Sequence, residues 1–412
     1  MPRSTPEIDY TDPSLYAETI LPVEAATTLL PAAYRDEAFA DVERDRVWRR
    51  SWVCVGYTSQ LPEAGDILTA DVADQPIMIV RGQDGDLRGF YNVCRHRGCQ
   101  LIDESQTNCR VIRCPCHSWG YGLNGELLGA PYFAGLSPEE LSDQLKQEFD
   151  TTDAEASGFR REDFSLLPVH VETWGCFVFV NLDPHPRPLS DWLGDLPQRY
   201  ARHRFEELQL YQRLDYEIQA NWKLVAENFM EYYHLPWVHP ELCNISGFDN
   251  HQRYQGPGMY MGMCTSPLSV APDTVTFDLP LFAGIDETEA ISAYFVLLFP
   301  NLALWIFPNH VVTLLYRPSS ATSTLEHMDM LLHPTALAKT DIAQRCKSVL
   351  EFYDMVNQQD VAIVERVQRG LRAREYPGGR MCFQFEEPVH RFQNMVIDLM
   401  TSDGREKAVS DH

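Results

Sequence analysis

Two short stretches decide what kind of protein this chain is: "CRHRGC" at residues 94–99 and "CPCHSW" at residues 114–119. The spacing is Cys-x-His, then 17 intervening residues, then Cys-x-x-His. Because each stretch is short, each can present two side chains to one metal centre at a small cost in chain entropy. The pattern predicts one metal site shared by two loops, with four candidate ligands: Cys94, His96, Cys114 and His117.

The order of these four residues separates the metal sites that cysteine and histidine can form. A Cys₂His₂ zinc site usually has two cysteines about two to four residues apart, followed by two histidines. Here the residue types alternate, which suits a Rieske-type [2Fe–2S] cluster, where two cysteines bind one iron and two histidines bind the other. Unrelated core residues are a weaker interpretation, because the four lie in short loops and not on one helix face. We therefore predict a Rieske cluster on Cys94, His96, Cys114 and His117.

Size and composition limit the remaining possibilities. The chain has 412 residues, enough for two or three domains, and a net charge of −25. So acidic a chain is not expected to bind nucleic acid, whose partners carry basic surfaces. No apolar run reaches the roughly 18 residues that span a bilayer, and the N-terminus lacks the apolar core of a secretory signal. We expect a cytoplasmic protein without a membrane partner.

The hydrophobic pattern predicts a small all-β module followed by a larger α+β domain. The "RGQDGDLRGF" stretch at 81–90 contains an Asp-Gly turn signal for a hairpin, and the Pro-rich 183–192 resembles a domain junction. The predicted domains are 45–182 for the cluster, and 1–44 with 183–412 for the rest. The predicted elements, in chain order, are a helix over 36–48, strands within 66–94 and 175–184, a strand over 208–219, a helix over 221–234, strands within 291–333, and helices within 339–370 and 388–400.

A second constellation lies in "AENFMEYYHLPWVHPEL" at 226–242. On a regular helix, His234 and His239 would point about 140° apart and could not share one ion. Pro236 lies between them and must kink or unwind the helix, which can bring both rings inward. Two histidines and one carboxylate with open positions form the facial triad of non-haem Fe(II) oxygenases.

The carboxylate of such a triad must come from elsewhere in the chain. Asp360, in "NQQDVAIVERVQRGL", is the best candidate, because its apolar neighbours would seat it against a core. Asp354 and Glu365 are rivals, and a solvated helix carboxylate is the plain alternative. Local periodicity does not identify a long-range ligand, so the residues alone leave this choice open.

Together, the Cys-x-His and Cys-x-x-His loops, the motif Asn-x-x-Glu-x-x-His-x₄-His and an Asp ahead of "VQRGL" resemble the catalytic subunit of Rieske non-haem iron oxygenases. The resemblance covers about 40–400. It implies an antiparallel sheet flanked by helices, of the helix-grip type, in the larger domain. It also implies that His234, His239 and Asp360 bind a mononuclear Fe(II), and that Glu231 and Asn228 take part in catalysis.

The resemblance further implies a homotrimer with head-to-tail contacts. In it, Glu231 would bridge His234 to a cluster histidine of a neighbouring subunit, with His117 as the expected partner. The chain has no Gly-x-Gly-x-x-Gly nucleotide fingerprint, so a separate NAD(P)H-dependent reductase is expected.

Glu231 suggests the branch of the family. Ring-hydroxylating dioxygenases usually have Asp as this bridging residue, with one more residue between it and the preceding Asn than this chain has between Asn228 and Glu231. This variant and the tail "VQRGLRAREYPGGR" resemble monooxygenases of carnitine, choline and glycine betaine. We expect hydroxylation of a small substrate with O₂, such as an N-methyl group of a quaternary ammonium compound. An arene dioxygenase and a pure electron carrier are the alternatives.

A quaternary ammonium group favours an aromatic wall, because cation–π contacts contribute about 0.5–2 kcal/mol each. Trp237, Trp305 and Phe307 are the candidates; Trp305 and Phe307 share one strand face by the period of two. Core packing is the alternative for each of them.

Two further cysteines, Cys99 and Cys116, lie inside the two cluster loops. They occupy the positions where respiratory-chain Rieske proteins carry a disulfide, and oxygenases usually have other residues there. In a reducing cytosol two thiols are expected, although a bridge is possible if their Cα atoms come within about 7 Å.

Overall fold

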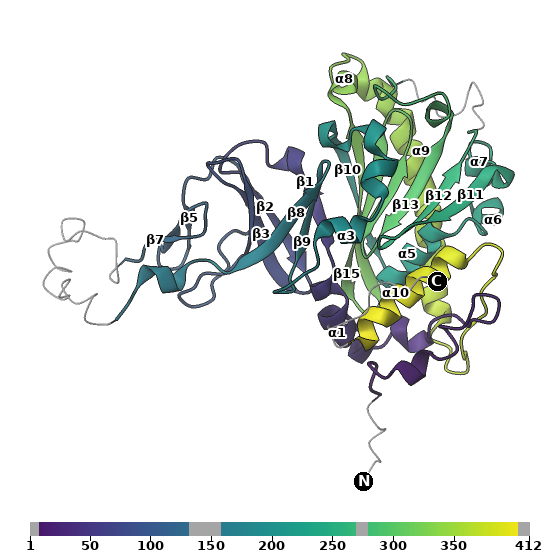
Figure 1. The fold of residues 1–412 in the computed structure, drawn as a ribbon, viewed down its shortest axis with the longest axis horizontal. Helices are drawn as coiled ribbons and strands as arrows, with labels where there is room; N and C mark the ends of the chain where they lie inside the picture. Colours follow the sequence, from purple (N-terminus) through teal and green to yellow (C-terminus); the bar gives the residue numbers. More distant parts are fainter. Residues whose placement is uncertain (1–7, 132–157, 269–278, 403–412) are drawn as a thin grey trace, which may run out of the picture. The chain divides into compact units, whose positions relative to one another are not determined.

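The computed structural model describes residues 8–131, 158–268 and 279–402 of the chain. These residues form two compact units (Figure 1). The larger comprises 1–54, 174–176 and 187–412, and the smaller comprises 55–173 and 177–186. The division expected from the sequence, 45–182 against the remainder, differs from this one over 45–54, 174–176 and 183–186.

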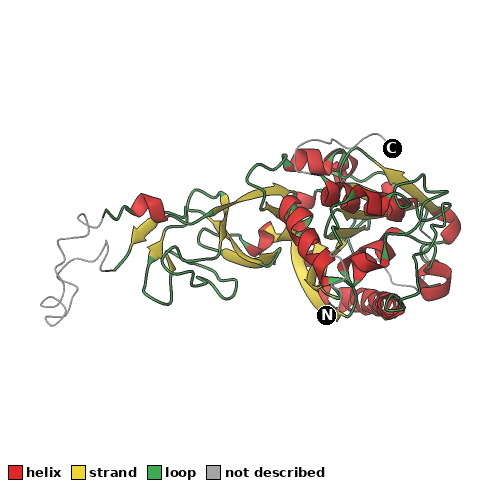
Figure 2. Cartoon of the chain, turned by 90° about the horizontal axis from the view of Figure 1, so that it is seen from below, coloured by secondary structure: helices red, strands yellow, loops and turns green. Residues whose placement is uncertain are grey.

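The smaller unit is built mainly from strands and loops, with short 3-10 helices at Thr58–Gln60 and Arg161–Phe164, as expected from its alternating hydrophobic pattern (Figure 2). Two left-handed residues, Ala73 and Asp74, make a two-residue turn between its first two long strands. The hairpin predicted at 81–90 is confirmed, with Arg81 paired to Leu87. A six-stranded sheet has the order β1 (Val53–Tyr57), β9 (Phe177–Asn181), β8 (Pro168–Trp174), β4 (Leu87–Tyr91), β3 (Gln75–Arg81) and β2 (Ile67–Val72). A three-stranded sheet has the order β5 (Ile112–Arg113), β6 (Gly120–Tyr121) and β7 (Leu127–Gly129).

The larger unit contains a seven-stranded antiparallel sheet with helices packed against it (Figures 1 and 2). Residues paired directly across antiparallel strands lie on the same face. One face therefore carries the row Phe295, Trp305, Val312 and Met330. The strand order is β10 (Gln209–Ile218), β16 (Ser323–Leu332), β15 (Val311–Ser320), β14 (Leu302–Ile306), β13 (Ala293–Leu298), β12 (Tyr260–Thr265) and β11 (His251–Gln255).

The longest helix, α9 (Ile342–Gly370), packs on that face of the sheet. Its buried residues recur every three or four positions, the pattern of a helix with one apolar side. Its contacts with the sheet include the Tyr353 ring, which lies 5.1 Å from the Trp305 ring, and a hydrogen bond that Asn357 donates to Glu326. Asp360 lies on the same stripe, between the buried Asn357 and Val364.

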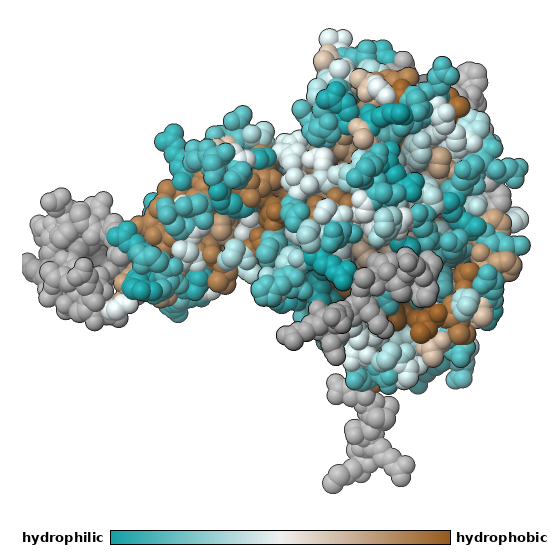
Figure 3. Space-filling view, viewed as in Figure 1, coloured by the Kyte–Doolittle hydropathy of each residue, from teal (hydrophilic) through white to brown (hydrophobic). Residues whose placement is uncertain are grey.

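The other helices flank the sheet or connect its strands. None of the helices in the described ranges is long and apolar enough to cross a membrane. Polar residues cover most of the visible surface of both units, in keeping with the net charge (Figure 3). The α-helices other than α9 in the described residues are α1 (Glu37–Arg46), α3 (Leu189–Leu193), α4 (Leu196–Arg199), α5 (Trp222–Met230), α6 (Leu235–Val238), α7 (Pro240–Cys243), α8 (Pro334–Leu337) and α10 (Glu387–Thr401).

The helix predicted over 221–234 is shorter than expected. It begins after the capping side chain of Asn221 and ends at Met230, and Glu231 is already extended, with φ −125° and ψ 156°. Pro236 lies in the first turn of a new short helix, α6, which begins at Leu235. Proline is tolerated there because the first amides of a helix have no intrahelical partner, so Pro236 does not kink a continuous helix.

Candidate active site

The two cluster loops are tight turns of similar construction in the smaller unit. In the first, the Cys94 amide donates to the Cys99 carbonyl at 2.8 Å, and the Gly98 amide donates to the Cys94 carbonyl. In the second, the Cys114 amide donates to the Trp119 carbonyl at 2.8 Å. Gly98 has a left-handed φ of +73°, which glycine adopts without steric cost. Each loop thus holds its cysteine and histidine on a fixed backbone.

The four predicted cluster residues divide into a buried and a more exposed pair. Cys94 and Cys114 are buried in the core of the smaller unit, and each thiol is a hydrogen-bond neighbour of the other. His96 is half-buried and His117 is exposed, and their ring centroids lie 4.7 Å apart. Two facing sulfurs inside and two adjacent imidazoles outside form the donor set that a Rieske cluster requires.

Tyr121 is a buried neighbour of this donor set that the sequence did not identify. Its hydroxyl accepts a hydrogen bond from the Arg95 amide at 3.0 Å and lies 3.3 Å from the Cys94 sulfur. Since its oxygen already accepts from Arg95, the hydroxyl proton is available to the sulfur. Burial raises the pKa of Tyr121, so the phenol keeps this proton. Hydrogen bonds to cluster sulfurs are one of the factors that set a Rieske reduction potential.

The second constellation lies in the larger unit, just after α5. His234 immediately precedes α6, and His239 lies between α6 and α7. Prolines at the starts of α6 and α7 interrupt the helix, so the two histidines approach from different short segments. Their ring centroids are 5.2 Å apart. The expected effect of Pro236, rings brought together by a break in the helix, matches this geometry.

Asp360, from α9, completes the constellation. Its Oδ1 lies 2.7 Å from His239 Nε2 and 3.5 Å from His234 Nε2, and it accepts a hydrogen bond from Asn228 Nδ2 at 2.6 Å. One donor atom from each of His234, His239 and Asp360 lies within 4.8 Å of the others.

The two rival carboxylates lie elsewhere on α9. Asp354 accepts hydrogen bonds from Tyr216 and Gln358, and Glu365 accepts one from the Gln219 amide.

The Nδ1 atoms of His234 and His239 each contact a side-chain oxygen. His234 Nδ1 lies 2.5 Å from Glu231 Oε1, and His239 Nδ1 lies 2.7 Å from Gln359 Oε1. When Nδ1 donates to an oxygen, the neutral ring presents a lone pair at Nε2, the form that binds a metal. Gln359, the neighbour of Asp360, was not identified from the sequence, because its role depends on a contact across 120 residues.

The electrostatics of this site suit a cation. Burial lowers the pKa of His234, but hydrogen bonds to Asp360 and Glu231 outweigh it and raise the pKa to about 10. Burial raises the pKa of Asp360, but its bonds to His234 and His239 lower it to about 2. The site therefore stabilises positive charge where the three side chains converge. Two nitrogens and one oxygen around that point fit a mononuclear iron.

Aromatic residues line the sheet beside this constellation. Trp305 stacks on Phe229 with centroids 6.5 Å apart and meets Tyr353 edge-on. Phe307 stacks on His310, whose Nε2 lies 2.9 Å from the Tyr353 hydroxyl. Trp305 lies in β14 and Phe307 directly follows that strand, and both rings lie near the Tyr353 ring, at 5.1 Å and 5.7 Å, which fits the prediction that they share one face.

The expectation that Trp237 belongs to the same wall is wrong. Trp237 is 81% exposed in this chain, whereas Trp305 and Phe307 are buried. Proximity in the sequence to both histidines was the only sign, and it does not fix the direction of a side chain.

A cavity of roughly 20 Å³, room for about one water, lies next to Asp360. Asn228, Tyr316, Glu326 and Asn357 contribute its polar lining. Burial raises the pKa of Glu326 to about 7, although its hydrogen bond from Asn357 acts in the opposite direction. A carboxyl group that titrates near neutrality thus lies beside the constellation.

Comparisons with known proteins agree with both constellations. The family profile described as Rieske [2Fe-2S] domain matches residues 51–140, and the profile of the ring hydroxylating alpha subunit (catalytic domain) matches residues 205–402.

The relatives include three oxidising enzymes. The carnitine monooxygenase oxygenase subunit of Escherichia coli (strain K12) is 29% identical, over 91% of this chain and 94% of its own length. Choline monooxygenase of Atriplex hortensis is 26% identical, over 91% of this chain and 78% of its own length. The glycine betaine monooxygenase oxygenase subunit of Pseudomonas aeruginosa (strain UCBPP-PA14) is 25% identical, over 91% and 90%.

Solved structures give the same result at the level of the fold. The quaternary ammonium Rieske monooxygenase CntA with L-carnitine has a TM-score of 0.74 and 25% identity, covering 94% of this chain and 99% of its own. Naphthalene 1,2-dioxygenase from Rhodococcus sp. shares the fold, with a TM-score of 0.75 at 20% identity. The match covers 95% of this chain and 98% of its own.

These matches and the two donor sets define the cofactors as a Rieske [2Fe–2S] cluster and a mononuclear iron. The chain thus combines a Rieske [2Fe-2S] domain with the catalytic domain of a ring hydroxylating alpha subunit, and over 91% of its length it is similar to the oxygenase subunits of carnitine and glycine betaine monooxygenases.

Proposed function

We propose that this chain is the terminal oxygenase of a monooxygenase that hydroxylates an N-methyl group of a quaternary ammonium compound. One O₂, two electrons and two protons convert the methyl group to a hydroxymethyl group and release one water. The hydroxymethyl ammonium then divides into a tertiary amine, formaldehyde and a proton. The observation that carries the proposal is the convergence of His234, His239 and Asp360, with Glu231 behind His234.

We propose Cys94, His96, Cys114 and His117 as the cluster ligands and His234, His239 and Asp360 as the iron ligands. When bound, the cluster supplies single electrons and the iron activates O₂. The protein's own side chains orient these groups. Glu231 and Gln359 hold the two rings with Nε2 toward the iron, and Asn228 fixes the Asp360 carboxylate through its 2.6 Å hydrogen bond.

The substrate class rests on the relatives and on the aromatic surface of the sheet. The similar proteins are named for carnitine, choline and glycine betaine, each of which carries a trimethylammonium group. Trp305 and Phe307 would face that group, and Phe229, which stacks on Trp305, extends the surface from α5. Aromatic faces attract such a cation and leave its methyl groups accessible.

Electrons would reach the iron across a subunit contact in a homotrimer. His117 is exposed in the smaller unit, and Glu231 lies at the surface end of α5 beside the exposed Tyr233 and Trp237. Exposed aromatic side chains are typical of protein interfaces. Glu231 of one subunit would then accept a hydrogen bond from His117 of a neighbouring subunit, joining the two centres.

A separate reductase would supply the electrons from NAD(P)H. Two of the relatives are named as oxygenase subunits, which fits an enzyme with a further component.

The test is product analysis with the iron-loaded protein, a reductase, NAD(P)H and a panel of quaternary amines and arenes. The proposal expects O₂ uptake that depends on an amine, with formaldehyde and a demethylated amine in equal amounts. A cis-diol from an arene, without turnover of any amine, would replace the proposal by an arene dioxygenase.

A further inference from the structure

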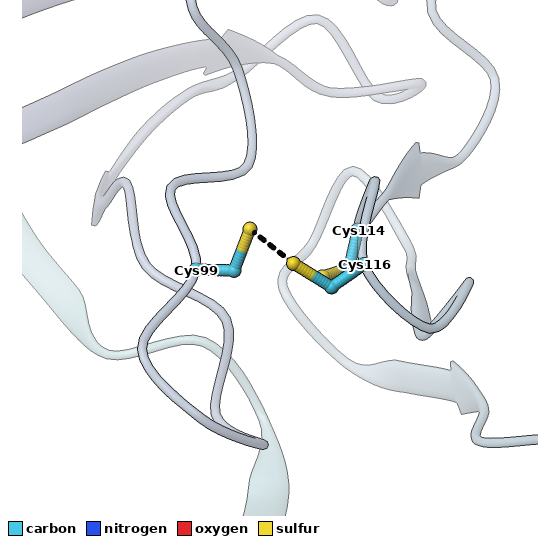
Figure 4. Close-up of side chains that lie close together, drawn as sticks. All are labelled: Cys99, Cys114 and Cys116. Carbon is cyan, nitrogen blue, oxygen red and sulfur yellow. Dashed lines mark hydrogen bonds between the residues drawn. The ribbon is translucent and has the colours of Figure 1, made fainter.

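Two cysteines that do not belong to the predicted cluster ligands lie in contact between the two loops. The Cys116 and Cys99 sulfurs are 2.9 Å apart, and neither is in a disulfide (Figure 4). A disulfide bond measures about 2.05 Å, so the sulfurs need to approach by less than about 1 Å to form one. Cys116 is exposed and Cys99 is half-buried, so an oxidant in solution reaches Cys116 first.

The backbone holds these sulfurs in position. The Cys99 carbonyl closes the first loop by accepting from the Cys94 amide, and the Ser118 amide donates to the Cys114 carbonyl across the second. The Cys116 thiol donates toward the Cys99 sulfur, and the Cys99 thiol donates to the Gln100 carbonyl at 3.3 Å. The two thiols are thus aligned by the same turns that present Cys94 and Cys114.

We propose that Cys99 and Cys116 form a reversible disulfide that locks the two cluster loops together when the protein meets peroxide. Hydrogen peroxide oxidises the Cys116 thiol to a sulfenic acid and releases one water. The Cys99 thiol then attacks that sulfur, forming the S–S bond and releasing a second water. A dithiol reductant returns both thiols by exchange and is itself oxidised to its disulfide.

The consequence is a longer-lived cluster under oxidising conditions. Separation of the two loops would release the cluster, and the bridge would oppose it by closing a loop with 16 residues between the two cysteines. Cross-links of this size disfavour the open chain. We expect the bridged form to lose its cluster to a chelator at least tenfold more slowly than the reduced form. This consequence rests on the proposed cluster ligands, whereas formation of the bridge does not.

The first test locates the bridge. The cluster-loaded protein is treated with hydrogen peroxide or with dithiothreitol, alkylated in denaturant, and digested with trypsin. Cleavage after Arg97, Arg110, Arg113 and Lys146 gives peptides 98–110 and 114–146. The proposal expects these two peptides to be linked after peroxide and separate after dithiothreitol.

Variants identify the sulfurs, because each peptide contains a second cysteine. Cys116→Ser and Cys99→Ser should each abolish the link. Cys109→Ser, in the same peptide as Cys99, is the matched control and should retain it. Complete alkylation of both Cys99 and Cys116 after peroxide would overturn the proposal, as would a link that survives Cys116→Ser.

The second test measures the consequence in the unaltered protein. Cluster absorbance is followed after adding an iron chelator, with and without peroxide treatment. Slower bleaching after peroxide, reversed by dithiothreitol and absent in Cys116→Ser, supports the loop lock. Equal bleaching rates, despite a bridge seen by mass spectrometry, would overturn it. Neither readout uses oxygenase activity, so a failure of the proposed function leaves both results interpretable.

Discussion

At the residue scale, the Asp360 carboxylate is the point where the second constellation comes together. Its Oδ1 contacts both histidines and Asn228, so an amide at this position would offer a weaker ligand and meet the Asn228 NH₂ group. Asp360→Asn should lower iron affinity at this site by at least about 100-fold while leaving the cluster in place.

Iron titration by calorimetry or by equilibrium dialysis measures this effect. Asp354→Asn is the matched control, because Asp354 lies on the same helix and bonds only Tyr216 and Gln358 among the described residues. Unchanged iron affinity in Asp360→Asn, or equal losses in both variants, would contradict the ligand assignment.

Glu231 should affect electron flow more than metal content. Gln in its place keeps an oxygen for His234 Nδ1 but removes the charge that would attract a second histidine. Glu231→Gln should retain both centres and lose turnover by about 100-fold or more. Stopped-flow reduction of the cluster, followed by its reoxidation in the presence of O₂ and substrate, measures the step. If the cluster of Glu231→Gln is reoxidised at the wild-type rate, Glu231 does not lie on the electron path between the cluster and the iron.

At this scale the sequence predicts what a local signal carries. Spacing predicted that His234 lies near His239, and that the cysteine and histidine of one loop lie near those of the other. Asp360 could not be separated from Asp354 and Glu365 without the family resemblance, because its position depends on how α9 packs on the sheet. The prediction that Trp237 belongs to the aromatic wall failed for the same reason, because packing sets the direction of a side chain.

At the element scale, α5 carries a half-buried carboxyl group whose titration should appear in the stability of the fold. Glu227 is half-buried and accepts hydrogen bonds from Tyr34 and Gln393. Burial raises its pKa to about 7, from 4.5 in the unfolded chain. Between these values the folded chain holds a proton that the unfolded chain has lost, so the folded state loses stability as pH rises.

The free energy of unfolding should therefore fall by up to about 3 kcal/mol between pH 4.5 and 7 relative to Glu227→Gln, which cannot ionise. Urea denaturation at a series of pH values gives this difference. The same substitution at the exposed Glu18 is the control and should leave the slope unchanged. A parallel pH dependence of wild type and Glu227→Gln would show that Glu227 does not titrate in this range.

Elements with strong periodicity were predicted well, and their ends were not. The 29-residue α9 and the final helix follow a regular apolar stripe. The end of α5 was placed four residues too late, because Glu231 to His234 have no helix-breaking residue of their own. The break arises from Pro236 further along, and from the contacts that hold Glu231 and His234 in their new directions.

At the scale of the whole molecule, the two donor sets lie in two different units of the chain. The order of an all-β module and an α+β domain could be predicted from the pattern. The proposed pairing of subunits has no such basis, because a contact surface between chains leaves no periodic pattern in the sequence.

Mixed oligomers test whether the electron crosses between subunits. Cys114→Ser removes a proposed cluster ligand and Asp360→Asn weakens a proposed iron ligand, so homo-oligomers of either variant should be inactive. Oligomers that contain both chains, isolated through two different affinity tags, should regain part of the activity, because an intact cluster would face an intact iron site. Inactive mixed oligomers of folded chains would show that both centres must lie on one chain.

The central claim is that one chain holds two different iron centres, and counting iron and acid-labile sulfide in the purified, reconstituted protein tests it most directly. A Rieske cluster with a mononuclear iron predicts three iron atoms and two sulfides per chain. Asp360→Asn should remove one iron and no sulfide. Two irons and two sulfides in the wild-type protein, with no further iron taken up on titration, would contradict the account and leave an electron carrier in its place.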